Sequence, residues 1–412
     1  MSTPVRDSIP QLPVPQAARV RPGVPFDPDA ATDAYLATVP ADLRARSDAY
    51  TEGGYWVQGW GFLLSAAILL FLLRGGWSRR MREWAERRSR RAPARTFLYT
   101  MLFTLIVTFL TFPFTVYVGF VREHAYGLAT QGFGGWLRDQ AVGLGVSLVL
   151  GGIATTALYE VLRRFPRAWP ALGAGVTMAF VVLGALITPV FIAPLFNRYS
   201  LLADPRVRDP ILRLAHANGI AADRVYLMDA SRQTTRISAN VSGLLGTERI
   251  TLNDNLLRRG TLPEIEAVMG HELGHYVLRH IYQFVLFAAL VTALGFTLLR
   301  AGVDWCLARW GGQWGVRGVD DPAGMPLLTL LFSVYLFALT PVLNTYVRNT
   351  EAAADIFGLN AARQPDGFAT IALKLAEYRK LDPGPVEELL WYDHPSGRAR
   401  IRMAMQWKGA QP

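Results

Sequence analysis

The residues best suited to chemistry in this sequence form the string HELGH at positions 271–275. On a helix, residues four apart lie one turn above each other, so His271 and His275 can present two imidazoles to one metal ion. Glu272 follows the first imidazole and can take a proton from a water on that metal. The string predicts hydrolysis of peptide bonds with one zinc ion per chain and Glu272 as general base. The alternative is two surface histidines on an amphipathic helix.

A polar stripe after the last apolar run offers a third ligand. Asn344, Arg348, Glu351 and Asp355 are spaced by four, three and four residues, which places them on one helix face. Polar groups beside a membrane span are costly unless they are paired, so such a stripe usually marks function. We expect Glu351 to bind zinc, Asp355 to accept a hydrogen bond from a liganding imidazole, and Arg348 to orient the Glu351 carboxylate. An ordinary salt-bridged face is the alternative.

Two further histidines need separate expectations. His394 precedes Pro395 and heads a final helical segment, so it can be either a helix cap or an active-site donor. His280 follows His275 by five residues, about 500° around a continuous helix, and is expected to lie off the ligand face.

The elements that position these residues are dominated by membrane helices. Only 18% of the 412 residues are charged and 51% are hydrophobic. The apolar residues gather into six runs of roughly the 20 residues that a helix needs to cross a bilayer. These runs lie near residues 56–74, 97–121, 140–163, 171–195, 282–300 and 325–345.

The runs divide the chain into alternating membrane and polar parts. We expect a poorly ordered polar arm, four spans, a catalytic segment with the HELGH helix, two more spans and a second catalytic segment: 1–50, 51–195, 196–281, 282–345 and 346–412. "DRVYLMDA" and "ERITLND" predict short strands in the first catalytic segment. The predicted fold is mainly α, a polytopic bundle carrying a gluzincin-like α+β zinc peptidase domain.

Charge and cysteine content exclude other classes. The net charge is +10, but the basic residues cluster beside apolar spans, which indicates contact with a bilayer and no nucleic-acid partner. Cys306 is the single cysteine, so an internal disulfide and a multi-cysteine zinc site are both excluded.

These motifs together resemble a known family. HELGH, the Glu351-x-x-x-Asp355 pair and His394-Pro395 are similar to those of the type I CAAX prenyl endopeptidases, which are integral membrane metallopeptidases. "PVFIAPLFNRYSLL" and "FVREHAYGLATQGFGGWLRD" resemble further stretches of that family. The resemblance implies that His394 faces the active site and stabilises the oxyanion, and it implies the same zinc ligands and base as above.

The resemblance also implies a substrate-binding residue. Asn240 in "SANVSG" matches an asparagine on the family's edge strand, which holds the substrate backbone. Val241 stands where the family has a tyrosine, so the side-chain contact there differs. A peptide adding to such an edge would bind as an extra strand.

The orientation in the membrane is open to two arguments. The segment 75–96 carries many arginines, and the positive-inside rule would place it in the cytoplasm and the zinc site outside. The resemblance implies a catalytic domain that faces the cytoplasm. We expect a cytoplasmic zinc site on a multi-pass protein of a bacterial inner membrane.

The expected partners are the bilayer and a peptide or protein substrate, including lipidated ones. Two other functions compete with a CAAX-type peptidase. One is a quality-control protease resembling the heat-shock membrane protease HtpX, whose chains are shorter with fewer spans. The other is a transporter or zinc-binding scaffold, which would place its polar pairs inside the spans.

Overall fold

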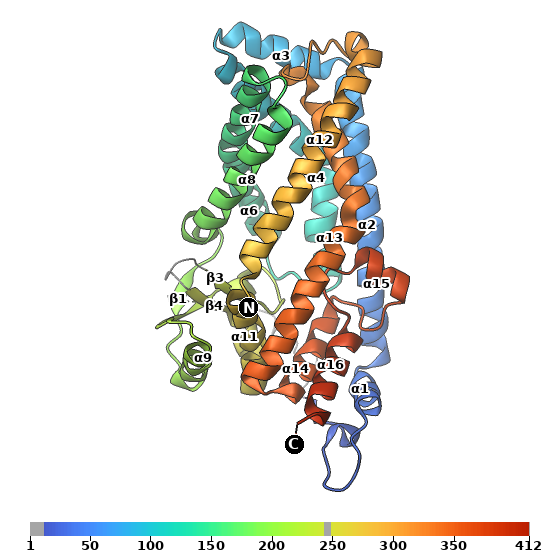
Figure 1. Cartoon of the computed structure of the whole chain (residues 1–412), viewed down its shortest axis with the longest axis vertical. Coiled ribbons are helices and arrows are strands. Elements are labelled where there is room, and N and C mark those ends of the chain that lie inside the picture. Colours follow the sequence, from blue (N-terminus) through green and yellow to red (C-terminus); the bar gives the residue numbers. More distant parts are fainter. Residues whose placement is uncertain (1–11, 243–248, 412) are drawn as a thin grey trace.

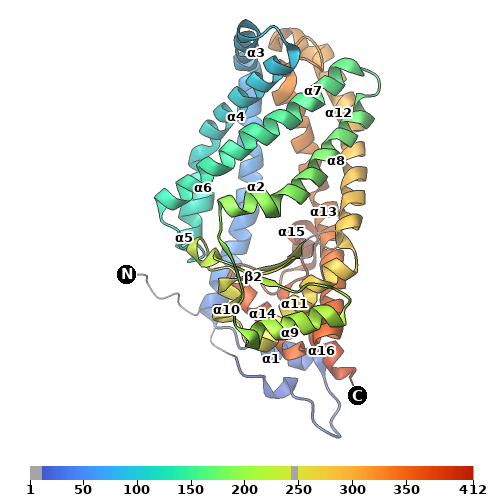
Figure 2. The same cartoon turned by 90° about the vertical axis from the view of Figure 1, so that its left-hand side faces the viewer.

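The protein is an elongated bundle of helices with a small sheet in its lower half, as the computed structural model shows (Figure 1). Residues 12–242 and 249–411 are described. The long helices run along the molecule's length, and α3 (Trp77–Arg88) lies across the end remote from the sheet. In the view turned by 90°, the sheet and the HELGH helix lie together below the end of α8 (Trp169–Ile187; Figure 2).

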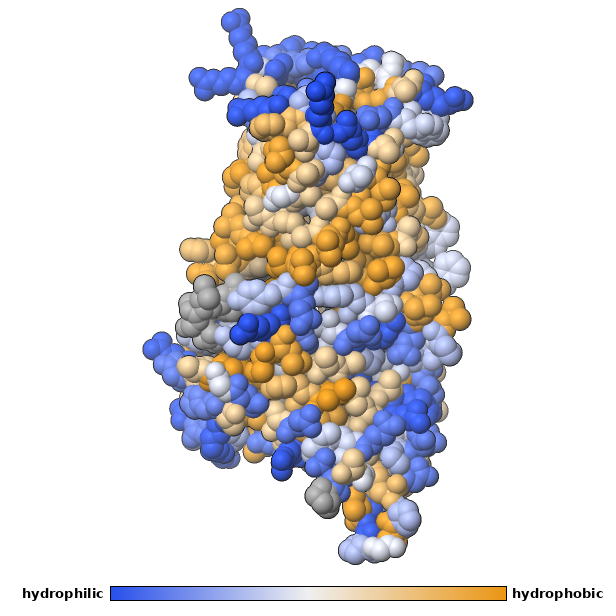
Figure 3. Space-filling model, in the orientation of Figure 1, coloured by the Kyte–Doolittle hydropathy of each residue, from blue (hydrophilic) through white to orange (hydrophobic). Residues whose placement is uncertain are grey.

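Six helical rods among the described residues are long and apolar enough to cross a membrane. In the most apolar stretch of each rod at most 22% of residues are buried, so most of these side chains face outward. Figure 3 shows the resulting apolar band between two hydrophilic ends. The rods are Ala41–Arg74 (α2), Ala92–Ala125 (α4 to α5), Phe133–Arg164 (α6 to α7), Trp169–Leu195 (α8 to η5), His280–Trp314 (α12) and Pro322–Ala362 (η7 to α13).

This arrangement confirms the predicted fold class. Four rods precede the HELGH helix and two follow it. Several rods contain a π-helical stretch, including Tyr117–Arg122 and Ser147–Gly151. The remaining helices that matter here are α9 (Pro205–Ala217), α10 (Asp254–Arg259), α11 (Leu262–Val277), α14 (Pro365–Lys374), α15 (Pro385–Trp391) and α16 (Gly397–Gly409).

The sheet has four strands in the order β1-β2-β4-β3. Strands β2 and β4 are parallel, and the two outer pairs are antiparallel. Alternate residues of β4, Ile250 and Leu252, are fully buried in a core shared with α9 and α11. Strand β3 is an edge strand among the described residues, with one side of its backbone facing away from β4. The strands are β1 (Tyr199–Leu201), β2 (Val225–Met228), β3 (Ala239–Ser242) and β4 (Arg249–Asn253).

Helix α11, which carries HELGH, begins where its sequence predicts. Thr261 and Glu264 form a reciprocal capping box around Pro263. The Glu264 carboxylate also accepts a 2.7 Å hydrogen bond from the buried ammonium of Lys374 on α14. The start of the helix is therefore anchored both locally and to the C-terminal part of the chain.

Helices α11 and α13 (Met325–Ala362) touch through their backbones. A Cβ on Gly358 would lie 2.7 Å from the His271 backbone nitrogen, and one on Gly270 would lie 2.9 Å from the Gly358 carbonyl oxygen. A Cβ on Gly274 would meet the Ala354 carbonyl oxygen at 3.2 Å. Only glycine permits this approach, so these three positions fix the distance between the two helices that carry the predicted ligands.

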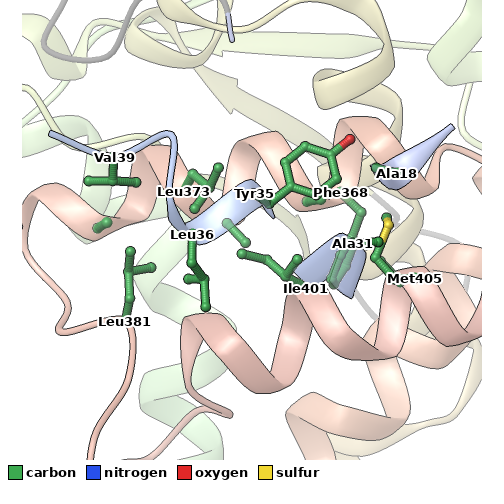
Figure 4. Close-up of a cluster of buried hydrophobic side chains, with 14 of the residues drawn as sticks. Ala18, Ala31, Tyr35, Leu36, Val39, Phe368, Leu373, Leu381, Ile401 and Met405 are labelled. Atoms are coloured by element: carbon green, nitrogen blue, oxygen red, sulfur yellow. The ribbon is translucent and has the colours of Figure 1, made fainter. Parts of the chain in front are cut away.

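The N-terminal arm differs from the expectation for 1–50. Helix α1 (Pro28–Leu36) is capped by Asp27 and buries Tyr35 and Leu36 against α14 and α16 (Figure 4). Tyr35 Oη donates a 2.7 Å hydrogen bond to Asp366. A few apolar residues in a Pro-rich, polar segment are enough to dock it because α14 and α16 offer a matching apolar face. Residues 1–11 lie outside the described part.

Replacing Gly358 with alanine should lower the thermal stability of the purified protein. The new methyl group would overlap the α11 backbone, and overpacking of this kind costs about 1–3 kcal/mol. Gly312→Ala is the matched control, because Gly312 is also helical and a Cβ there meets nothing within 4 Å. Thermal unfolding of the purified proteins in detergent measures the stability of both variants. Equal stability of the two variants would contradict the assigned backbone contact.

Candidate active site

Three side chains from two helices converge at the crossing of α11 and α13. His271 Nε2 and His275 Nε2 lie 3.2 Å apart. Glu351 Oε2 lies 3.3 Å from His271 Nε2, and Glu351 Oε1 lies 3.4 Å from His275 Nε2. The three groups were expected as ligands, and the fold brings them into one triangle, with the two histidine nitrogens at two corners and the Glu351 carboxylate, which turns one oxygen to each nitrogen, at the third.

The size of this triangle fits a zinc ion. With zinc–ligand distances of about 2.0–2.2 Å and tetrahedral angles, neighbouring donor atoms lie about 3.3 Å apart. The observed separations of 3.2–3.4 Å, taken for each histidine to the Glu351 oxygen that faces it, are close to that value. Two histidines and one carboxylate form a donor set typical of catalytic zinc, because three protein ligands leave a coordination position open.

A buried chain of charges supports His271. Its Nδ1 lies 2.7 Å from Asp355 Oδ1, and Asp355 is fully buried. Arg400 on α16 donates to both Asp355 oxygens, at 2.9 Å and 2.5 Å. Asp355 therefore lies where it was expected, while Arg400 was missed. The signal available for it was general: a buried carboxylate needs a cation, and "HPSGRAR" supplies two arginines close to His394.

Arg348 does not have the predicted contact with Glu351. Its guanidinium donates to the carbonyl oxygens of Glu388 and Tyr392, at 2.8 Å and 2.6 Å, and to Thr345. Helical spacing placed Arg348 on the correct face but did not reveal that α15 packs there. Its observed effect is to hold the segment that leads into His394.

His394 lies at the site. Its Nε2 is 3.3 Å from Glu351 Oε2, and its Nδ1 is 2.8 Å from Asp393 Oδ1. The cap of α16 is instead Ser396, whose hydroxyl accepts from the Ala399 amide. Of the two readings that the sequence left open, the geometry favours a residue that faces the ligand triangle.

His280 also lies at the site, contrary to the expectation that it points away. Its Nδ1 is 2.9 Å from His275 Nδ1, and only 7% of the residue is exposed. The expectation assumed one continuous helix. Helix α11 ends at Val277, and Arg279 adopts a left-handed conformation with φ 58° before α12 begins at His280.

The acid–base groups of α11 have shifted pKa values. Burial raises the pKa of Glu272 to about 7, although the nearby His271 lowers it in part. Burial lowers the pKa of His271, but the hydrogen bonds to Asp355 and Glu351 outweigh burial and raise it to about 10. Burial and the neighbouring His271 lower the pKa of His275 to about 4. Without metal, His271 therefore carries an additional proton at neutral pH, and binding of zinc to its Nε2 must displace that proton.

Asn240 lies on the edge strand, as expected from the sequence. It is exposed, and it pairs with Thr251 of β4 in the antiparallel register. A cavity of about 370 Å³ lies against this face of the sheet and is bounded on the other side by the end of α8. Its lining includes Asn240, Ser242 and Thr251 together with Thr188 and Pro189. The edge therefore borders a space large enough for side chains of a bound peptide.

Comparison with known proteins identifies two family regions. Residues 202–408 match the sequence pattern of Peptidase family M48. The family described as CAAX prenyl protease N-terminal, five membrane helices, matches residues 30–198, a part in which this chain has four spans. Together the two matches cover both the membrane region and the residues of the site.

Individual relatives agree with these matches. A metalloprotease of Bacillus subtilis (strain 168), YhfN, is 29% identical over 85% of this chain and 82% of its own length. CAAX prenyl protease 1 of Saccharomyces cerevisiae is 31% identical over 50% of this chain and 46% of its own length. The crystal structure of Ste24p from S. mikatae shares the fold, with a TM-score of 0.74, 22% identity and 89% coverage of each chain.

These findings favour a peptidase over the transporter and scaffold alternatives. The M48 match spans half of the chain and contains the whole ligand triangle. The match to the CAAX prenyl protease N-terminal family covers the membrane helices at residues 30–198, and the Ste24p structure shares the fold over 89% of the chain. The chain belongs to peptidase family M48 and is a membrane zinc metalloendopeptidase that resembles the CAAX prenyl proteases.

Proposed function

We propose that the triangle of His271, His275 and Glu351 binds one zinc ion and that Glu272 is the general base of peptide-bond hydrolysis. The observation that carries this proposal is the match between the donor separations of 3.2–3.4 Å and tetrahedral zinc. The two histidines come from one helix and the carboxylate from another, so the triangle exists only in the folded protein.

The chain's own residues supply the proton chemistry. Bound zinc would polarise the scissile carbonyl and acidify a water molecule. Glu272 is partly buried and has a pKa raised to about 7, so near neutral pH it can both accept a proton from water and return it to the leaving amine. His394, beside Glu351, is positioned to donate a hydrogen bond to the carbonyl oxygen as negative charge develops there.

The edge strand β3 is our proposed binding site for the substrate backbone. A peptide paired with β3 would extend the sheet, and Asn240 would hold its backbone at that edge. Strand β3 packs against α11, and Ala239 and Val241 contact the core that contains Leu273. A peptide on this edge would therefore run beside the helix that carries Glu272.

The substrates we propose are proteins or peptides that reach the site at the membrane, and lipidated proteins are the first class to test. The support is the activity after which the relatives are named, since they include CAAX prenyl proteases from several eukaryotes. The position of the triangle adds to it, since Glu351 belongs to the last membrane rod. We place the protein in a bacterial inner membrane, on the basis of the Bacillus relative.

Glu272→Gln should abolish cleavage while leaving zinc bound. The amide keeps the size of the side chain but cannot accept the proton, so we expect kcat/KM to fall at least about 100-fold. Cleavage of a peptide mixture and metal analysis of the purified protein provide the two readouts. Glu266→Gln, on the same helix but paired with Gln364, is the control. Full activity of Glu272→Gln would refute the assigned base.

Activity should decline as the pH is lowered through the pKa of Glu272. Because burial raises this pKa to about 7, the active carboxylate form prevails above that pH and is lost below it. Zinc's positive charge favours the carboxylate, so the midpoint in the loaded enzyme should lie at or below about 7. A kcat/KM that stays constant or rises as the pH is lowered over the whole range in which zinc remains bound would contradict this assignment.

We propose that the zinc site faces the cytoplasm, on the basis of the family resemblance. The arginine-rich α3 end supports the opposite orientation through the positive-inside rule. Alkaline phosphatase and green fluorescent protein fusions after residue 412 distinguish the two, because phosphatase is active only outside. We expect fluorescence without phosphatase activity; an active phosphatase and a dark fluorophore would reverse the orientation.

A further inference from the structure

The connection between α11 and α12 has an unusual backbone conformation. Arg279 has φ 58° and ψ 37°, and it is one of two non-glycine residues with positive φ among those described, the other being Arg363. Such a conformation is disfavoured for a residue with a Cβ and persists where the surrounding structure requires it. The Arg279 side chain is exposed, so its own packing does not require this conformation. The conformation instead sets the direction in which the backbone leads to the next residue.

The next residue is His280, which the break turns back onto the zinc ligand His275. On an uninterrupted helix the two would be separated by about 500° and would lie on different faces. Here their Nδ1 atoms are 2.9 Å apart, and the rings meet edge to face at a centroid distance of 5.0 Å. His280 is buried even though it begins a membrane rod.

The direction of this hydrogen bond follows from the ligand triangle. His275 contributes Nε2 to the triangle, so its other nitrogen, Nδ1, must carry the proton. His275 Nδ1 is then the donor, and His280 Nδ1 must be the unprotonated acceptor. His271 follows the same pattern, because its Nε2 is in the triangle and its Nδ1 faces Asp355.

We propose that His280 is a positioning residue for the zinc site, which orients His275 and fixes its tautomer, and that the left-handed turn at Arg279 exists to place it. The proposal rests on the zinc site proposed above. Outer partners of this kind hold a ligand's ring in the binding orientation, and their loss typically weakens metal affinity about 10–100-fold. Each histidine ligand thereby has its own partner, a carboxylate for His271 and an imidazole for His275.

The two partners differ in what they do to their ligands. Asp355 brings a negative charge, which Arg400 balances, whereas His280 accepts the hydrogen bond as a neutral ring. The His275 side of the site therefore gains orientation without a second buried anion. Because His280 is the first residue of α12, the orientation of His275 is also tied to the start of a membrane span.

The decisive comparison is between His280→Leu and His280→Asn. The asparagine Oδ1 can occupy the place of His280 Nδ1 and accept the same hydrogen bond, whereas leucine fills the space without an acceptor. We expect the leucine variant to bind zinc about 10–100-fold more weakly and the asparagine variant to recover most of that loss. Competition with a chromophoric chelator measures affinity, and the visible spectrum of the Co²⁺-substituted protein reports ligand geometry.

A matched set of substitutions at Arg279 and Arg363 tests the backbone part of the proposal. Arg279→Gly keeps the left-handed conformation accessible and should retain zinc affinity, whereas Arg279→Val disfavours it and should weaken affinity as His280→Leu does. Arg363→Val imposes the same backbone change at the end of α13 and should leave zinc affinity unchanged. Equal zinc affinity of Arg279→Val and Arg363→Val would overturn the role of the turn.

The outcome can be separated from failure of the zinc site itself. His275→Ala should abolish tight zinc binding; if the wild-type protein binds no zinc, the proposed function fails first. If the wild type binds zinc, His275→Ala does not, and His280→Leu binds with wild-type affinity and an unchanged Co²⁺ spectrum, then only the role of His280 is refuted.

Discussion

The backbone contact between α11 and α13 is the constraint on which the site depends. Gly270, Gly274 and Gly358 let the two helices approach to a distance that side chains would prevent. At that distance a carboxylate from one helix reaches two imidazoles on the other without a loop or a long side chain. The donor atoms are therefore held by two rigid elements, and the triangle needs little reorganisation to accept a metal ion.

Buried charge then ties the rest of the catalytic part to this crossing. Asp355 is fully buried on α13 and is paired with Arg400 of α16, and an unpaired charge there would be strongly destabilising. Arg348 binds two carbonyl groups of the segment before His394. Helix α13 thus positions one proposed ligand, the hydrogen-bond partner of another and the approach to His394, and it belongs to a membrane rod.

The sequence predicted those features that depend on local periodicity. The HELGH spacing, the face shared by Glu351 and Asp355, and the six apolar runs all follow from 3.6 residues per turn and the thickness of a bilayer. Partners supplied by distant segments were not predictable in this way, so Arg400 was missed and Arg348 was assigned the wrong contact. The prediction that His280 lies off the ligand face was wrong for a different reason. Helical periodicity was extended across a helix break that no proline or glycine marks, because the left-handed residue at the break is an arginine.

The docking of α1 on α14 and α16 has a consequence for biogenesis. Tyr35 and its partner Asp366 are 331 residues apart, and every membrane rod lies between them. The binding face of α1 is therefore absent until the intervening chain has been synthesised, and Arg400 follows later still. During synthesis, a half-inserted chain already displays HELGH but lacks Glu351, Asp355, Arg400 and His394. The proposed ligand set is therefore complete in the chain only after the sixth membrane rod has been reached.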